Sequence, residues 1–278
     1  MNKLFRPVVL FLVATLLLAA CGSLSAQTST PTAPPVVILK VSGSGTITNV
    51  LEALKPAFEE ATPGYKLEVL PGNSTGSGVT GILEGVLDMA AMARAPKDEE
   101  TAQNIKYYEM GQVGQAIIAH PSVTNVASLN TQQISDIFSG KITNWSEVGG
   151  PDLKIVLYVR DPDDSSTKGL RKAIIGETPF PDTATTLTSQ GDMVVSVEGT
   201  SGSVGVAAWP AMIALNAKMQ AISVNGTQPN DPSYPILGSA GIGYLAERES
   251  DVQPLINWLS SADGQSTLKK LGFVLAAE

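Results

Sequence analysis

The sequence has a single cysteine and a single histidine, and its basic residues are outnumbered by acidic ones. Without a second cysteine the chain cannot form an intramolecular disulfide. The 26 Asp and Glu against 18 Lys and Arg give a formal net charge of −8, which argues against nucleic acid and against a basic membrane-binding face. No histidine or carboxylate cluster in the sequence has metal-ligand spacing, so we expect neither a metal nor a cofactor.

The first 20 residues have the pattern of a signal peptide. Lys3 and Arg6 form a positive segment, and residues 8–18 are apolar but too short to span a membrane as a stable helix. Residues 18–21 resemble a bacterial lipobox. This resemblance implies that Cys21 is lipidated and becomes the new N-terminus, so that the lipid alone anchors an extracytoplasmic protein to a bacterial membrane. A plain secretory signal or a free thiol is the alternative.

Residues 21–35 are rich in Ser, Thr, Pro and Ala and have no apolar period, which indicates a disordered tether. About 243 residues follow, enough for one large or two medium domains. Removing residues 1–20 takes the formal charge to −10. An anionic ligand must therefore be held by short-range hydrogen bonds and one or two local arginines, because long-range electrostatics oppose it.

Residues 36–60 show the pattern of a buried strand, a loop of Ser, Gly and Thr, and an amphipathic helix. Apolar residues recur at helical spacing, which predicts a helix that begins at Thr46 or Ile47. The first turn of a helix has unpaired N–H groups at the positive end of the helix dipole. This combination favours an anion site at Ser44, Gly45 and Thr46. An ordinary helix cap is the alternative.

The same pattern recurs in the next segment. A strand is predicted at residues 66–70, a Ser/Thr/Gly loop at residues 71–78, and a helix after it. Because parallel strands end at the same edge of a sheet, we expect this second loop to lie beside the first. Its candidate ligand residues are Thr75, Gly76 and Ser77.

A third instance follows a strand predicted at residues 154–159. Arg160 directly follows this strand, and a helix is predicted at residues 168–175. An arginine can bind two oxygens of a tetrahedral oxyanion while hydroxyls and amides bind the others. The candidate ligand residues of the third loop are Arg160, Asp164, Ser165, Ser166 and Thr167.

Arg94 directly follows a short apolar strand predicted at residues 88–93 and can point into the same cleft. A solvated surface arginine is the alternative. Residues 115–119 are strand-like and are expected to cross into a second lobe. A further strand is predicted at residues 193–197, followed by a glycine-rich loop at residues 199–205.

Other known motifs match this sequence only in part. The first loop has Thr48 where a dinucleotide fingerprint needs its third glycine, and it lacks the Gly-Lys-Ser/Thr of a P-loop. Residues 72–76 match the Gly-x-Ser-x-Gly of α/β hydrolases, but that family needs a late histidine and the chain has only His120. Residues 165–168 match Ser-x-x-Lys of penicillin-recognising enzymes without their partner motifs. We therefore expect a binding protein and not an enzyme. The alternative from another functional class is a serine hydrolase.

Residues 138–150 closely resemble the signature stretch of the phosphate-binding proteins of bacterial ABC importers, which are type II periplasmic binding proteins. The resemblance covers nearly the whole mature chain. Residues 43–46, residues 75–78, and Arg160 with residues 165–167 look like the three phosphate loops of that family. The resemblance implies a monomer with two α/β lobes, a central ligand cleft that holds one dehydrated phosphate, and the permease subunits of an ABC importer as partners.

The same resemblance implies lobe boundaries. Lobe I is expected to contain residues 36–117 and 236–278, and lobe II residues 118–235; one continuous sheet would contradict this division. Inorganic phosphate keeps a proton at neutral pH, so a phosphate site needs an acceptor for it, and Asp164 is our candidate.

The chain departs from the family pattern at several positions. Ala93 stands where the family often has a serine, the Arg160 loop is one residue longer than usual, and Ser166 replaces a glycine. A site for another oxyanion, such as sulfate or a tungstate-like ion, therefore stays open, as does a ligand-sensing lipoprotein without a transporter.

Overall fold

Strand β4 (Ile105–Ala119) changes partners along its length. Up to Gly114 it pairs antiparallel with β10 (Leu237–Leu245), and from Gln115 it pairs antiparallel with β8 (Ser203–Ala208). The computed structural model describes residues 35–276. Through β4 its strands form one ladder in the order β2-β1-β3-β10-β4-β8-β6-β7, with β9 paired to β4 and β5 paired to β9. The strands are therefore not divided between two separate sheets, as the predicted division into lobes required.

The remaining strands are β1 (Val37–Gly43), β2 (Tyr65–Val69), β3 (Met89–Met92), β5 (Ser128–Leu129), β6 (Val156–Arg160), β7 (Thr185–Leu187) and β9 (Gln220–Val224). The α-helices are α1 (Gly45–Ala61), α2 (Thr75–Leu83), α3 (Asp98–Thr101), α4 (Thr131–Phe138), α5 (Ser165–Leu170), α6 (Gln190–Gly199), α7 (Trp209–Ala214), α8 (Glu249–Ser260) and α9 (Ala262–Lys270). A π-helical turn at Arg171–Ile175 follows α5, and short 3-10 helices lie at Trp145–Val148 and Ala246–Arg248.

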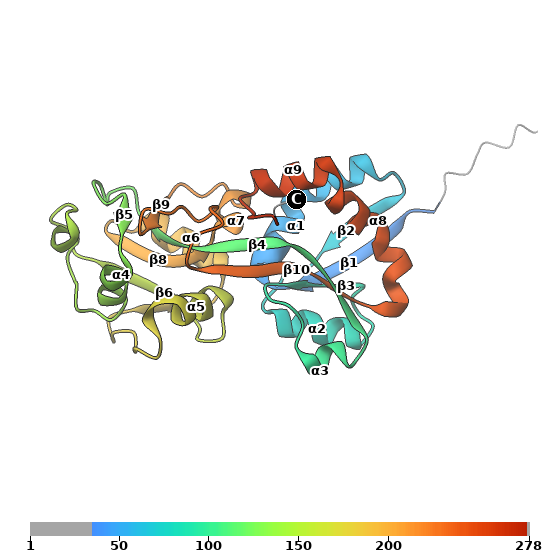
Figure 1. Cartoon of the computed structure of the whole chain (residues 1–278), viewed down its shortest axis with the longest axis horizontal. Helices are drawn as coiled ribbons and strands as arrows, with labels where there is room; N and C mark the ends of the chain where they lie inside the picture. Colours follow the sequence, from blue (N-terminus) through green and yellow to red (C-terminus); the bar gives the residue numbers. More distant parts are fainter. Residues whose placement is uncertain (1–34, 277–278) are drawn as a thin grey trace, which may run out of the picture. The chain divides into compact units, whose positions relative to one another are not determined.

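The hydrophobic side chains divide into separate cores on the two sides of the partner change in β4. One core joins α1, α8 and α9 to β1, β2, β3 and β10, and in it Phe58 meets Trp258 edge to face at 5.8 Å between ring centroids. A second core surrounds the fully buried Trp145, and a third lies under α6 and α7. Figure 1 shows the first group of elements on one side and the other two on the opposite side, with β4 and β10 running between them.

We name the half around Phe58 lobe I and the half around Trp145 lobe II. The predicted two-lobed α/β fold is thus confirmed. The boundaries proposed from the sequence, residues 36–117 with 236–278 and residues 118–235, remain a proposal; the continuous ladder counts against them, and Ile117 and Ile236, predicted in lobe I, lie in the core around Trp145.

Close backbone packing fixes the loops at one edge of the lobe I sheet. β1 runs parallel to β2 and to β3, so their carboxyl ends meet. Gly43, which ends β1, has a φ of +143°, and a Cβ there would lie 2.3 Å from the carbonyl oxygen of Ala91. At Gly78 in α2 a Cβ would lie 2.7 Å from the Ser42 carbonyl oxygen. Only glycine allows these approaches, and they bring the first two candidate loops together.

The predicted strand at residues 193–197 was wrong, because this segment belongs to helix α6. The β-branched residues favour a strand by propensity, but Met193, Val194 and Val197 have helical spacing and fill the third core. The Ser189 hydroxyl caps the helix by accepting from the Asp192 N–H at 3.0 Å. The strand of this region is β8, which occupies part of the segment predicted as a glycine-rich loop.

Two predicted boundaries also moved. Strand β4 begins at Ile105, ten residues before the expected crossing strand, and α5 begins at Ser165, three residues before the expected helix. None of the helices within residues 35–276 is long and apolar enough to cross a membrane. Residues 1–20, Cys21 and most of the predicted tether lie outside the described residues.

Candidate functional site

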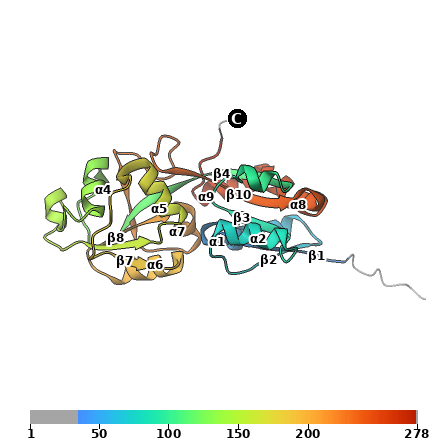
Figure 2. The ribbon, with the colours of Figure 1, turned by 90° about the horizontal axis from the view of Figure 1, so that it is seen from below.

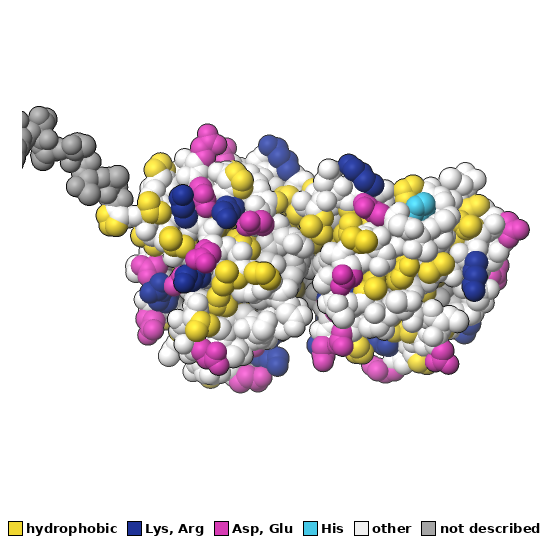
Figure 3. Space-filling view, turned by 180° about the vertical axis from the view of Figure 1, so that it is seen from behind, with side chains coloured by type: hydrophobic (Ala, Val, Ile, Leu, Met, Phe, Trp, Pro, Cys, Tyr) yellow, Lys and Arg dark blue, Asp and Glu magenta, His cyan; other side chains and the backbone are white. Residues whose placement is uncertain are grey.

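A cavity of about 600 Å³ lies between the two lobes. Loops at the carboxyl ends of β1, β2, β3 and β6 line it, together with the segment before α6 and the start of β10. Figure 2 shows α1 and α2 of lobe I facing α5, α6 and α7 of lobe II, and Figure 3 shows from behind the indentation where the lobes meet. The lining residues are 44–46, 72–76, 93–95, 97, 160, 163–165, 168–169, 172, 188–190 and 237–239.

Most of the site residues predicted from the sequence lie on the wall of this cavity. They are Ser44, Gly45, Thr46, Thr75, Gly76, Arg94, Arg160, Asp164 and Ser165. All three predicted loops contribute, so segments that are more than one hundred residues apart in the sequence converge on one space.

Three other candidates are not on the cavity wall: Ser77, Ser166 and Thr167. The Ser77 hydroxyl completes a capping box at the start of α2 by accepting from the Ser74 N–H at 3.2 Å, and it donates to the Ser74 carbonyl oxygen at 2.8 Å. The Thr167 hydroxyl donates to the Arg160 carbonyl oxygen at 3.2 Å, and the Ser166 hydroxyl is fully buried. The sequence could not separate hydroxyls that order a loop from hydroxyls that face the cavity, because both follow a strand in the same pattern.

The first turn of α1 faces the cavity. Ser44 is the N-cap, yet its side chain makes no capping hydrogen bond, so it does not act as an ordinary side-chain cap. The Ser44 N–H donates to the Ala91 carbonyl oxygen at 2.8 Å and fixes the loop against β3. The first-turn N–H groups of this 17-residue helix, including those of Gly45 and Thr46, have no partner within the helix and form the positive end of its dipole.

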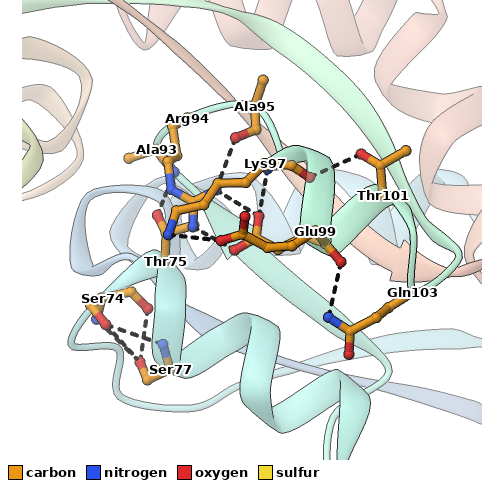
Figure 4. Close-up of polar contacts among 11 residues, drawn as sticks. Ser74, Thr75, Ser77, Ala93, Arg94, Ala95, Lys97, Glu99, Thr101 and Gln103 are labelled. Atoms are coloured by element: carbon orange, nitrogen blue, oxygen red, sulfur yellow. Dashed lines mark hydrogen bonds and ion pairs between the residues drawn. The ribbon is translucent and has the colours of Figure 1, made fainter.

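Thr75, at the start of α2, ties the second loop to the end of β3 (Figure 4). Its hydroxyl oxygen accepts from the Ala93 N–H at 3.0 Å. A hydroxyl that accepts keeps its own hydrogen for donation. Thr75 therefore adds a hydrogen-bond donor to the lobe I wall of the cavity.

Arg94 lines the cavity but is held by a carboxylate (Figure 4). Its Nη1 and Nη2 each donate to one oxygen of the buried Glu100 at 2.7 Å, and Nη1 also donates to the Ala95 carbonyl oxygen at 2.9 Å. The hydrogen bond with Glu100 raises the pKa of Arg94, and the same bond lowers the pKa of Glu100. Glu100 also accepts from the Lys97 N–H at 2.8 Å, so the Arg94–Glu100 pair orders the loop after β3.

Arg160 is the last residue of β6 and only 6% exposed. Its Nη1 donates to Gln190 Oε1 at 3.3 Å, its Nη2 donates to the Thr188 carbonyl oxygen at 3.2 Å, and Nη2 lies 3.2 Å from Asp164 Oδ2. Its Nε is buried without a partner among the described residues. Leaving a charged donor unpaired in the interior is costly, so this N–H favours an acceptor that the described residues do not supply.

Asp164 has two roles that the sequence did not assign. It is the N-cap of α5, and its Oδ1 accepts from the N–H groups of Ser166 at 2.9 Å and Thr167 at 3.4 Å. Its Oδ2 is the ion-pair partner of Arg160. The start of α5 is therefore closed by its own cap, unlike the start of α1.

The sequence reasoning missed the lobe II segment Thr188, Ser189 and Gln190, which also lines the cavity. The error at residues 193–197 concealed it, since a strand there leaves these residues in an ordinary loop. The signal that could have found them is Ser189 followed three residues later by Asp192, a helix-start pattern. It missed Lys97, Lys168 and Lys172 as well, and Lys168 appeared in a motif only as the last residue of the partial Ser-x-x-Lys match.

The fold and the cavity define a class of protein, the two-lobed binding proteins that hold a ligand between their lobes. The domain model of the PBP superfamily matches residues 26–261, so the chain belongs to this superfamily.

Phosphate-binding proteins are among its relatives. The phosphate-binding protein PstS of Bacillus subtilis is 27% identical over 241 residues, covering 83% of this chain and 77% of the relative. PstS of Borreliella burgdorferi is 22% identical over 281 residues, covering 96% and 97%. A crystal structure of a phosphate ABC transporter substrate-binding protein from Clostridium perfringens with bound phosphate is 25% identical and has a TM-score of 0.74, covering 86% of this chain and all of that chain. These relatives are binding proteins by name, which supports the prediction that the chain is not an enzyme.

Proposed function

We propose that the chain captures inorganic phosphate between its two lobes and delivers it to an ABC importer. One observation carries this proposal: the buried Arg160, whose Nε–H has no partner among the described residues, lines a cavity whose opposite wall is the uncapped N-terminus of α1. Both features supply donors and positive potential, and a tetrahedral oxyanion needs both because its oxygens are acceptors around one centre. The similarity to PstS proteins and to the phosphate-bound structure from Clostridium perfringens supports phosphate among the oxyanions.

Both lobes contribute donors to this cavity. Lobe I offers the first turn of α1 and the Thr75 hydroxyl, and lobe II offers Arg160 and the Ser165 hydroxyl. Asp164 lies beside Arg160 and is our candidate acceptor for the proton that phosphate keeps at neutral pH. Sulfate has no such proton, so a carboxylate at this place disfavours it.

The proposal includes the location of the protein outside the cytoplasm, at a bacterial membrane. Signal peptide 1–20 would direct export, a lipid on Cys21 would hold a monomer at a bacterial membrane, and residues 21–35 would tether the domain within reach of the permease subunits. Cys21→Ser tests the anchor in the producing bacterium: the protein is expected to move from the membrane fraction to the soluble extracytoplasmic fraction. A variant that stays in the membrane fraction would contradict lipid anchoring.

The ligand is tested by calorimetric titration of the chain from residue 22, after partial unfolding and dialysis to remove co-purified anions. Phosphate, arsenate, sulfate and tungstate are titrated at one pH and one ionic strength. Saturable binding of phosphate with weaker binding of sulfate supports the proposal. Tighter binding of sulfate or tungstate would move the function to another oxyanion, and no binding of any of the four would refute the site.

A further inference from the structure

The Gln190 side chain joins the two lobes across the cavity. It is the first residue of α6 and is 4% exposed. Its Oε1 accepts from Arg160 Nη1 at 3.3 Å, and its Nε2 donates to Thr46 Oγ1 at 3.3 Å. Thr46 lies in the first turn of α1, whose apolar face belongs to the lobe I core, whereas α6 packs on a lobe II core. One carboxamide therefore connects the buried arginine of lobe II to the anion-facing helix of lobe I.

Chemistry fixes the direction of both hydrogen bonds. A guanidinium can only donate, so the carboxamide oxygen of Gln190 must face Arg160. The carboxamide nitrogen then faces Thr46, and because this nitrogen only donates, the Thr46 hydroxyl must accept. Within residues 35–276 the Thr46 hydroxyl makes no other hydrogen bond, so its own hydrogen remains for donation into the cavity that it lines.

The two bonds form a series with one polarity. Arg160 donates to Gln190, Gln190 donates to Thr46, and Thr46 is left as a donor. Hydrogen bonds aligned in this way strengthen one another, most of all in a buried network. The series begins at a buried positive charge and ends beside the positive end of the α1 dipole, so both ends favour an acceptor-only oxygen.

We propose that Gln190 is a positioning residue, which holds Arg160 and sets the Thr46 hydroxyl as a donor to the bound anion. The inference rests on the proposed phosphate function. It adds to the site a residue that belongs to none of the three candidate loops. It also assigns direction to the site: the oxygen next to Thr46 is unprotonated, and a protonated oxygen lies on the side of Asp164.

A double-mutant cycle tests the inference. Gln190→Met keeps the side-chain length and removes both hydrogen-bonding ends, and Thr46→Val removes the hydroxyl at nearly constant volume. The two variants, their combination and wild type are titrated with inorganic phosphate as the anion-free chain from residue 22. Each single variant is expected to bind about 5-fold to 100-fold more weakly, the effect of leaving a buried partner unpaired. The dissociation constant of the double variant for phosphate should be within about threefold of that of the weaker-binding single variant, because the two residues act in one series.

Gln265→Met is the matched control, because Gln265 in α9 is outside the cavity and its Nε2 donates to the Leu259 carbonyl oxygen at 2.7 Å. It should leave the phosphate affinity unchanged. The thermal unfolding midpoint of each phosphate-free variant is measured as well. If Gln190→Met lowers the midpoint and leaves the affinity unchanged, Gln190 is structural and the inference is wrong.

Fully additive losses in the cycle would also overturn the inference, since they would place Gln190 and Thr46 in independent interactions. If Gln190→Met does not fold, the cycle is run with Gln190→Glu, which still accepts from Arg160 but cannot donate to Thr46. A wild-type chain that binds no phosphate refutes the proposed function first, before any variant is measured. Phosphate binding by wild type with no coupling between the two residues refutes the inference alone.

Discussion

Replacing Arg160 by lysine should weaken anion binding much more than an arginine-to-lysine substitution outside the cavity does. The guanidinium is held in place by Gln190, by the Thr188 carbonyl and by Asp164, and its Nε remains without a partner. A lysine ammonium keeps the positive charge but has one nitrogen, which cannot hold these partners and also meet the ligand.

The size of the effect follows from the donors that are lost. A hydrogen bond to a charged group contributes about 1.5 to 3 kcal/mol in a buried site. Loss of one such bond to the anion corresponds to about a 10-fold to 150-fold increase in the dissociation constant. Because Arg160 is only 6% exposed, salt should screen its contribution poorly, and the ratio between variant and wild type should persist at high ionic strength.

The assay is calorimetric titration of the anion-free chain with phosphate at two ionic strengths. Arg171→Lys is the matched control, since Arg171 is in the same lobe, donates to the Gly176 and Thr178 carbonyl oxygens and does not line the cavity. The control should bind phosphate like wild type. Equal affinities of wild type and Arg160→Lys would place Arg160 outside the binding interaction and would remove the main support for the proposed function.

Three further results are expected. Asp164→Asn should keep the helix cap but lower the phosphate-to-sulfate affinity ratio, because the acceptor for the phosphate proton is lost; an unchanged ratio in competitive titrations would reject this role. Gly43→Ala should destabilise the fold by more than about 2 kcal/mol in urea unfolding, since its Cβ would meet the Ala91 carbonyl; a smaller loss would show that the loop adapts. The pKa of Glu100 is lowered by Arg94 from its ordinary value of 4.5, so the pair stabilises the fold above that pH and the contribution is lost as the pH falls through the lowered value. The thermal midpoint of Glu100→Gln should lie below that of wild type at pH 7 and approach it in acid; a constant difference would contradict the assignment.

The three strand-loop-helix segments were predictable because each rests on local signals. A buried strand, glycines or hydroxyl residues and an apolar helical period occur in that order, and parallel strands end at one edge. The helix predicted to begin at Thr46 or Ile47 begins at Gly45, and the loops of Thr75 and Arg160 line the same cavity. The convergence of distant loops thus followed from topology, not from any contact visible in the sequence.

The state of each helix start could not be predicted in the same way. The same Ser, Thr and Asp residues either cap a helix with their own side chains or leave its N–H groups to a ligand. Ser74 and Asp164 cap α2 and α5, whereas the Ser44 side chain makes no cap. The choice depends on tertiary contacts, such as the hydrogen bond from the Ser44 N–H to the Ala91 carbonyl oxygen of β3.

The local prediction failed where strand propensity opposed helical spacing. Residues 193–197 contain three valines, whose propensity favours a strand. The cap at Ser189 and the packing of this segment in the third core instead determine a helix. That error had a functional consequence. A strand at this place gives no reason to examine Gln190, whereas a helix that begins there aims its first residue at Arg160 and Thr46.

The cavity of this acidic protein contains five cationic side chains, but four of them lie beside carboxylates. Arg94 contacts Glu100 at 2.7 Å, Lys97 contacts Glu99 at 3.4 Å, Arg160 contacts Asp164 at 3.2 Å and Lys168 contacts Asp163 at 2.7 Å. Only Lys172 lining the cavity has no ion-pair partner among residues 35–276. Most of the cationic charge at the site is therefore balanced by neighbouring carboxylates, so charge alone discriminates little between anions. Selectivity must come from directed donors, namely the Arg160 guanidinium, the first turn of α1 and hydroxyls whose direction is fixed by their neighbours. A chain with a formal charge of −8 can therefore bind an anion. Its donors act at contact distance, whereas its distant negative charges are screened by salt.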